Sequence, residues 1–210
     1  MESQPGPLNA RDDGAALLLV MIVLLVLAGL AFAAVSLAEL EGAASANDAG
    51  ALAVAYAADA AVERVIDDLG AVADWTDVLG GGLSSALRSA DARPQTPWGA
   101  ELDVDSMTRE VQADPDVGVG PDQTRWRVFL TGPLTSMMPE ASSSVLSYLV
   151  AWVGDDEGDG DGSPWADANR VLRIRVRAVG PRGVRADREA VVSRDAVTGV
   201  VRARTRWVPA

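Results

Sequence analysis

Apolar and polar residues follow three different patterns along this chain of 210 residues. Residues 15–38 carry no charged side chain, residues 55–69 place apolar side chains three and four positions apart, and from residue 100 onward apolar and polar side chains alternate. The first pattern is typical of a membrane-spanning helix, the second predicts a helix with one buried face, and the third predicts β-strands.

The uncharged run is long enough to cross a membrane. Its 24 residues would form a helix of roughly 36 Å, which exceeds the hydrocarbon core of a bilayer at about 30 Å. A cleaved secretory signal begins with a basic segment, whereas Glu2, Arg11, Asp12 and Asp13 precede this run. We therefore predict a transmembrane helix over residues 15–38, preceded by an unstructured leader.

The helix is predicted to continue well beyond the membrane, because no proline interrupts the chain before Leu69. Its second half carries one apolar face that is expected to pack on a folded domain. In the first half, Gly29 is a small residue that would let neighbouring helices approach closely. The residues expected to pack are Gly29, Ala55, Ala58, Val62, Val65 and Leu69.

The alternating part predicts five or six strands, at residues 101–105, 125–130, 145–153, 172–177, 186–192 and 201–206. Short turns join most of them, which predicts an antiparallel sheet with one buried face. The expected fold class is therefore α+β, in which a long N-terminal helix, transmembrane in its first half, packs on an antiparallel β-sheet.

Two segments in the first third of the chain carry a family resemblance. An apolar helix, AALLLVMIVLLVLAGLA, directly follows Gly14, and residues 55–64 read AYAADAAVER. The first segment resembles the signal of type IV pilins and pseudopilins, in which a short polar leader ends in glycine. Together the two segments are similar to the N-terminal domain of PilX-type minor pilins.

The resemblance implies a domain organisation, a location and partners. A prepilin peptidase would cut between Gly14 and Ala15, which separates a leader at residues 1–14 from a pilin-type helix at residues 15–70. Residues 71–210 would form a periplasmic α+β domain, which completes the lollipop shape of a pilin. The protein would reside in the inner membrane and then in a pilus or pseudopilus. Its partners would be other pilins and minor pilins, the peptidase and an inner-membrane assembly platform.

Two positions differ from the pattern of major pilins. Leu19 occupies the fifth position of the expected mature chain, where major pilins carry glutamate, and Asp12 and Asp13 replace the usual basic residues before the cut. The K-type pseudopilin of type II secretion and many PilX-like proteins share the first difference. The resemblance therefore implies a minor subunit that assembles into, or primes, a pilus-like filament.

Composition excludes several kinds of site. The chain contains neither cysteine nor histidine, which excludes disulfides, thiolate or imidazole metal sites and Ser-His triads. Carboxylates are abundant, but the sequence places no acid and base together in a cleft. We therefore do not expect an enzyme.

The net charge of −12 is unevenly distributed. Residues 170–210 contain eleven arginines and three acids, which makes this segment +8 and the rest of the chain −20. Alternating arginines on a sheet could contact nucleic-acid phosphates. Glu101, Asp103 and Asp105 offer the opposite charge at the same spacing, however, and cross-strand pairs of this kind are common. We therefore expect solvated or internally paired arginines and no nucleic-acid partner.

An acidic loop at residues 153–169 is the most distinctive part of the expected domain. Within it, the spacing E-x-D-x-D-G at residues 157–162 resembles the opening of an EF-type calcium loop, although Ala168 stands at the twelfth position. The loop is also similar to one found in PilX-like proteins. It is either a solvated acidic tip or a calcium site. The candidate Ca²⁺ ligands are Asp155, Asp156, Glu157, Asp159, Asp161, Asp167 and Asn169.

A second function stays open on the sequence. The chain could be an uncleaved, single-pass anchored periplasmic protein whose acidic loop binds a ligand or calcium. The N-terminus of the mature protein separates the two hypotheses, because cleavage would leave Ala15 as the first residue and an anchor would keep Met1.

Overall fold

The computed structural model describes residues 10–115, 120, 123–139, 146–158 and 160–207. Within these, helix α1 runs over Ala10–Ala71 and passes Gly42 and Gly50 without a break. The prediction that Met1 to Asp13 are unstructured is wrong for residues 10–13, which belong to α1. No proline occurs in these residues to prevent a helix.

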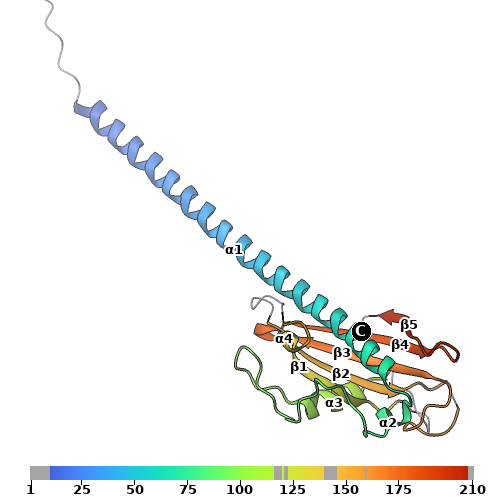
Figure 1. The fold of residues 1–210 in the computed structure, drawn as a ribbon. Helices are drawn as coiled ribbons and strands as arrows, with labels where there is room; N and C mark the ends of the chain where they lie inside the picture. The colour runs from blue at the N-terminus through green and yellow to red at the C-terminus, as the bar shows by residue number, and fades with distance from the viewer. Residues whose placement is uncertain (1–9, 116–119, 121–122, 140–145, 159, 208–210) are drawn as a thin grey trace, which may run out of the picture. The chain divides into compact units, whose positions relative to one another are not determined.

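The chain divides into two compact units, Met1–Asp48 and Ala49–Ala210. The described part of the first unit is helical throughout. The second unit contains the last part of α1, all of the strands and the shorter helices (Figure 1). The expected combination of a long apolar N-terminal helix with an antiparallel sheet is therefore present, and the fold class is α+β.

The sheet is a five-stranded antiparallel meander in the order β1-β2-β3-β4-β5. Alternation of apolar and polar residues predicted all five strands, with boundaries that differ by a few residues. Helix α4 (Leu134–Met137) follows β1, and the short helix η2 (Pro181–Gly183) connects β3 to β4. The strands are β1 Arg127–Pro133, β2 Tyr148–Asp155, β3 Val171–Val179, β4 Arg185–Arg194 and β5 Val201–Trp207.

The strand predicted at residues 101–105 is wrong. Helix α3 occupies Val104–Gln112, and α2 is a single turn at Thr76–Leu79. Asp103 caps α3, because its side chain accepts a hydrogen bond from the backbone N–H of Ser106 at 2.8 Å. The alternation before this cap covers only a few residues, whereas Val104, Met107 and Val111 continue at helical spacing.

Both faces of the sheet are buried at β2 and β3, which corrects the prediction of one buried face for the centre of the sheet. Successive residues of β2 point to opposite faces, as in any strand. Leu149, Ala151 and Val153 join the core beneath the last part of α1, whereas Tyr148, Val150 and Trp152 join a second core with α3. All eight residues of β2 are buried as a result.

Arg194 of β4 holds the C-terminal end of α1. Its guanidinium donates hydrogen bonds to the carbonyl oxygens of Leu69 and Ala73, each at 2.7 Å, and to that of Val72. The same group stacks on the Trp75 ring at 4.5 Å from the ring centre. A cation at this position satisfies the last carbonyls of the helix and interacts favourably with its dipole.

Close packing of α1 on the sheet leads to a stability prediction. Ala58 is fully buried in the core under α1, whereas Ala51 is exposed on the same helix. We expect Ala58→Leu to lower the free energy of unfolding by about 1–3 kcal/mol, because extra methylenes force a packed core apart. Urea unfolding of the full chain in detergent, followed by tryptophan fluorescence, measures this. Ala51→Leu is the matched control, and an equal loss there would contradict the packing argument.

Candidate functional site

Apart from Ser36, which is partly buried, the uncharged run of α1 is exposed along its length. Every residue from 15 to 34 is exposed, and the large side chains range from Val23 at 46% to Phe32 at 76% of their accessible surface. The run reaches a mean hydropathy of 3.1 over 18 residues. Soluble monomers rarely expose continuous apolar surface of this extent. This helix is therefore long and apolar enough to span a membrane.

The predicted cleavage position lies within the first turns of this helix. Gly14 and Ala15 are both helical, and the preceding residues 1–9 lie outside the described part of the chain. Leu19 is 64% exposed. This position therefore presents an exposed apolar side chain.

The residues predicted to pack on the domain separate into two groups. Ala58, Val62, Val65 and Leu69 are buried against the sheet, and Ala55 is partly buried. No atom outside the helix lies within 4 Å of the place where a side chain at Gly29 would begin. Sequence spacing missed other members of the buried face, namely Val54, Ala57, Ala61 and Ile66. The two parts of α1 thus present different surfaces, one exposed and apolar, the other packed.

Arginines of β3 form buried ion pairs within the domain. Arg177 donates two hydrogen bonds to Asp187 of β4, each at 2.7 Å, and one to Glu110 of α3 at 2.8 Å. These contacts raise the pKa of Arg177, chiefly through the hydrogen bonds to Asp187, and lower the pKa of Glu110, chiefly through the hydrogen bond from Arg177. Both groups are therefore held in their charged forms.

Glu189 joins two further arginines of the same strand. This carboxylate is 1% exposed, and its Oε1 accepts hydrogen bonds from Arg173 at 2.5 and 3.0 Å. Arg175 lies directly opposite Glu189 in the β3–β4 register and also donates to Asp114 at 2.7 Å. The arginines of β3 are thus paired inside the protein.

The predicted acidic partners of these arginines are wrong. Glu101 and Asp103 lie instead 3.5 and 3.8 Å from the guanidinium of Arg93. The side chains of Arg202 and Arg204 in β5 are exposed, so these two arginines are solvated. Solvation was one of the two states that the sequence predicted for the arginines of the sheet. The side chain of Arg206 lies outside the described residues.

The acidic loop is held by local hydrogen bonds at both of its ends. Asp155 is buried at the end of β2. Asp156 accepts from the backbone N–H of Gly158 at 3.1 Å and from the amide of Asn169 at 2.9 Å, which links the two ends of the loop. Glu157 lies 3.7 Å from the guanidinium of Arg173.

The remaining carboxylates of this loop form tight turns. Asp161 accepts from the backbone N–H of Ser163 at 2.7 Å, and Asp167 accepts from that of Arg170 at 2.6 Å. Burial raises the pKa of Asp167, and its backbone hydrogen bonds oppose this shift. In the described part of the chain, no three His, Cys, Asp or Glu side chains come together to hold a metal. Asp159 lies outside the described residues.

The calcium hypothesis stays a prediction from the sequence and can be tested on the full chain in detergent. If calcium binds this loop, saturating Ca²⁺ is expected to raise the melting temperature by about 5 °C over the value in chelator. Asp161→Asn should abolish the rise, whereas Asp105→Asn on α3 should leave it intact. An unchanged melting temperature would leave the loop as a solvated acidic turn.

Comparisons of this chain with protein families, curated proteins and solved structures found no match.

Proposed function

We propose that this protein is a minor pilin or pseudopilin of PilX type, which is cut by prepilin peptidase and assembles into, or primes, a type IV pilus-like filament. The proposal is supported by the difference between the two parts of α1. One uninterrupted helix has an exposed apolar half without charge and a second half that packs on a folded domain.

Such a helix serves two environments in succession. In the inner membrane, lipid covers the apolar residues 15–38. In a filament, helices of neighbouring subunits cover them instead, and small residues such as Gly29 permit close approach. The transfer from lipid to protein exchanges one apolar environment for another, so an assembly platform has to supply the work of extraction. The role is assembly rather than catalysis.

Leu19 suggests where in the filament this subunit belongs. In related pilins a carboxylate at this position meets the N-terminal amine of a neighbouring subunit. A leucine cannot form that ion pair, so a subunit with Leu19 is best placed where it needs no such neighbour. We therefore propose a position at or near the tip, where assembly begins.

The alternative is an uncleaved anchored protein whose domain acts alone at the membrane surface. The same apolar helix would anchor it equally well, and the acidic loop would then be its functional part. The alternative gives no reason for a helix that continues without proline from the membrane run into the domain core.

The experiment is to identify the mature N-terminus and the fraction that contains the protein. Native protein should begin at Ala15 and should co-purify with fibres sheared from the cell surface or with isolated pseudopili. A protein that begins at Met1 and stays entirely in the inner-membrane fraction would support the anchored alternative.

A further inference from the structure

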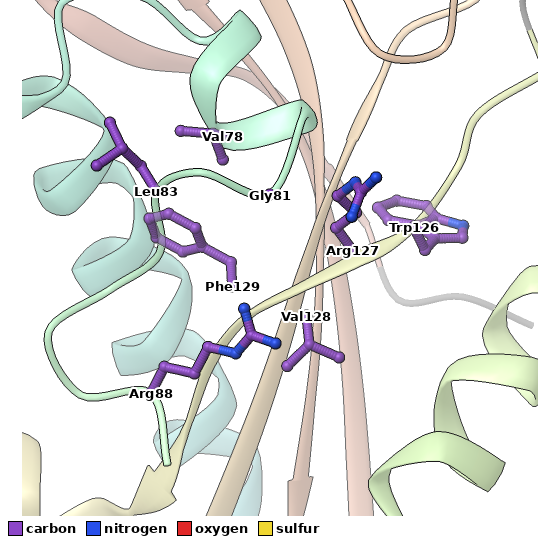
Figure 2. A pocket seen from close by; sticks show the side chains of 8 residues that line it. All are labelled: Val78, Gly81, Leu83, Arg88, Trp126, Arg127, Val128 and Phe129. Carbon is purple, nitrogen blue, oxygen red and sulfur yellow. The ribbon is translucent and has the colours of Figure 1, made fainter. Parts of the chain in front are cut away.

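A pocket of about 280 Å³ lies between the segment after α2 and strand β1. Figure 2 shows the residues that line it, with one guanidinium group from each of these two elements. Apolar side chains form part of its wall, and Arg88 and Arg127 border it. The lining residues are Val78, Gly81, Leu83, Arg88, Trp126, Arg127, Val128 and Phe129.

Arg127 is held in place without a carboxylate. Its guanidinium stacks on the Trp165 ring of the acidic loop, 4.4 Å from the ring centre. A side chain at Gly81 would begin 2.8 Å from Nη1 of Arg127, and Gly81 has a φ of +81°. Glycine at this position therefore leaves room for the guanidinium, and the stacking fixes its plane.

The edge of this guanidinium still has hydrogen bonds to donate. The Nε atom of Arg127 is buried and has no hydrogen-bond partner among the described residues. Stacking on Trp165 uses the face of the guanidinium, so the N–H groups in its plane are left for an acceptor. Because Nε is buried, the Nη groups, one of which lies beside Gly81 of the pocket wall, are the donors that a ligand can reach.

Arg88 and Arg127 differ from the arginines of β3. Arg173, Arg175 and Arg177 each contact carboxylates within 4 Å. No described carboxylate lies within that distance of Arg88 or Arg127, although the chain contains 30 acidic residues. Arg88 and Arg127, which both border this pocket, therefore have no carboxylate partner among the described residues, although the chain is rich in acids.

We infer that this pocket binds a carboxylate carried on a small apolar body, such as the end of a peptide with an apolar last residue or a small organic acid. Arg127 offers a planar fork of donors to the carboxylate, and Arg88 adds a second positive charge at the rim. Leu83, which is 44% exposed, provides apolar surface for the rest of the ligand, whereas Val78 and Phe129 are almost fully buried. The volume suits a group about the size of one amino-acid residue.

This inference goes beyond the proposed assembly role and does not depend on it. It can be tested on the full chain in a non-ionic detergent, with N-acetylphenylalanine as the probe and N-acetylphenylalaninamide as its uncharged counterpart. Saturation-transfer NMR titrations should give saturable binding of the acid, with a Kd on the order of 1 mM, as expected for a ligand of this size. The amide should bind about tenfold more weakly, because it lacks the charge.

Variants locate the binding. Arg127→Gln should weaken binding of the acid about tenfold or more, and Arg88→Gln should weaken it less, because Arg88 is exposed. Arg125→Gln removes the same charge from an exposed neighbour that does not line the pocket, and it should bind like the unchanged protein. Equal melting temperatures of the three variants show that the fold is retained.

Three results would overturn the inference. The first is the absence of saturable binding of the acid, and the second is equal binding by the Arg127→Gln variant or by protein-free micelles. In the third, inorganic phosphate or acetate displaces the probe as effectively as N-acetylphenylalanine itself, which would mean that the apolar wall adds nothing. None of these outcomes bears on whether the chain is cut after Gly14.

Discussion

Replacing Glu189 by glutamine is expected to lower the free energy of unfolding by about 3 kcal/mol. The Glu189 carboxylate is almost completely buried and accepts hydrogen bonds from Arg173, and it lies opposite Arg175 and 3.8 Å from its guanidinium. Glutamine has nearly the same shape but no charge, so two largely buried cations would lose their shared counter-charge. Asp114 and Glu157 still contact these arginines, which keeps the expected loss below that of an isolated buried charge.

The measurement is urea unfolding of the full chain in detergent, followed by the fluorescence of its tryptophans. Glu101→Gln is the matched control, because Glu101 contacts Arg93 at the surface at 3.5 Å and both side chains are exposed. Exposed pairs contribute at most about 1 kcal/mol. If both variants lost equal stability, the buried ion pairs between β3 and β4 would contribute no more to the free energy of unfolding than an exposed pair, which would contradict the prediction.

Replacing Gly14 by valine is expected to block maturation of the protein. Under the proposed function, the peptidase cuts directly after Gly14, and a β-branched side chain beside the scissile bond would obstruct its approach. In cells that carry a prepilin peptidase, the variant should accumulate in the membrane with Met1 still attached and should be missing from sheared fibres. Mass spectrometry of the purified protein separates the two forms.

A matched control makes the same substitution elsewhere in the leader. Gly6→Val adds the same side chain away from the proposed cut and should leave processing after Gly14 unchanged. If the Gly14 variant is processed as efficiently as the Gly6 variant, cleavage after Gly14 is refuted. The protein would then be better described as an anchored domain.

Sequence patterns predicted the strands of the sheet well, for a local reason. In β3, Leu172, Ile174 and Val176 alternate with three arginines. Because side chains of a strand alternate with a period of two residues, such a run identifies a strand without knowledge of the neighbouring strands. The same reasoning failed at residues 101–105, where the alternation was short and ended at the N-cap of α3. The hydrogen bond from Ser106 to Asp103 decided that boundary.

The candidate sites were less accessible to sequence reasoning. Spacing identified Ala58, Val62 and Leu69 as packing residues, because helical periodicity reports one buried face. Spacing could not find the pocket beside Arg127, because Arg88, which lines the pocket, and Trp165, which stacks on Arg127, come from distant parts of the chain.

The sequence by itself determined the long helix, the apolar run in its first half and the five alternating strands, because each depends on a periodicity that neighbouring residues establish among themselves. Only the tertiary structure decided which partners the charges have. Whether an arginine on a strand is solvated, paired or free depends on what covers that face of the sheet. Here α3 covers it, so Arg177 contacts Glu110, which lies 67 residues earlier in the chain.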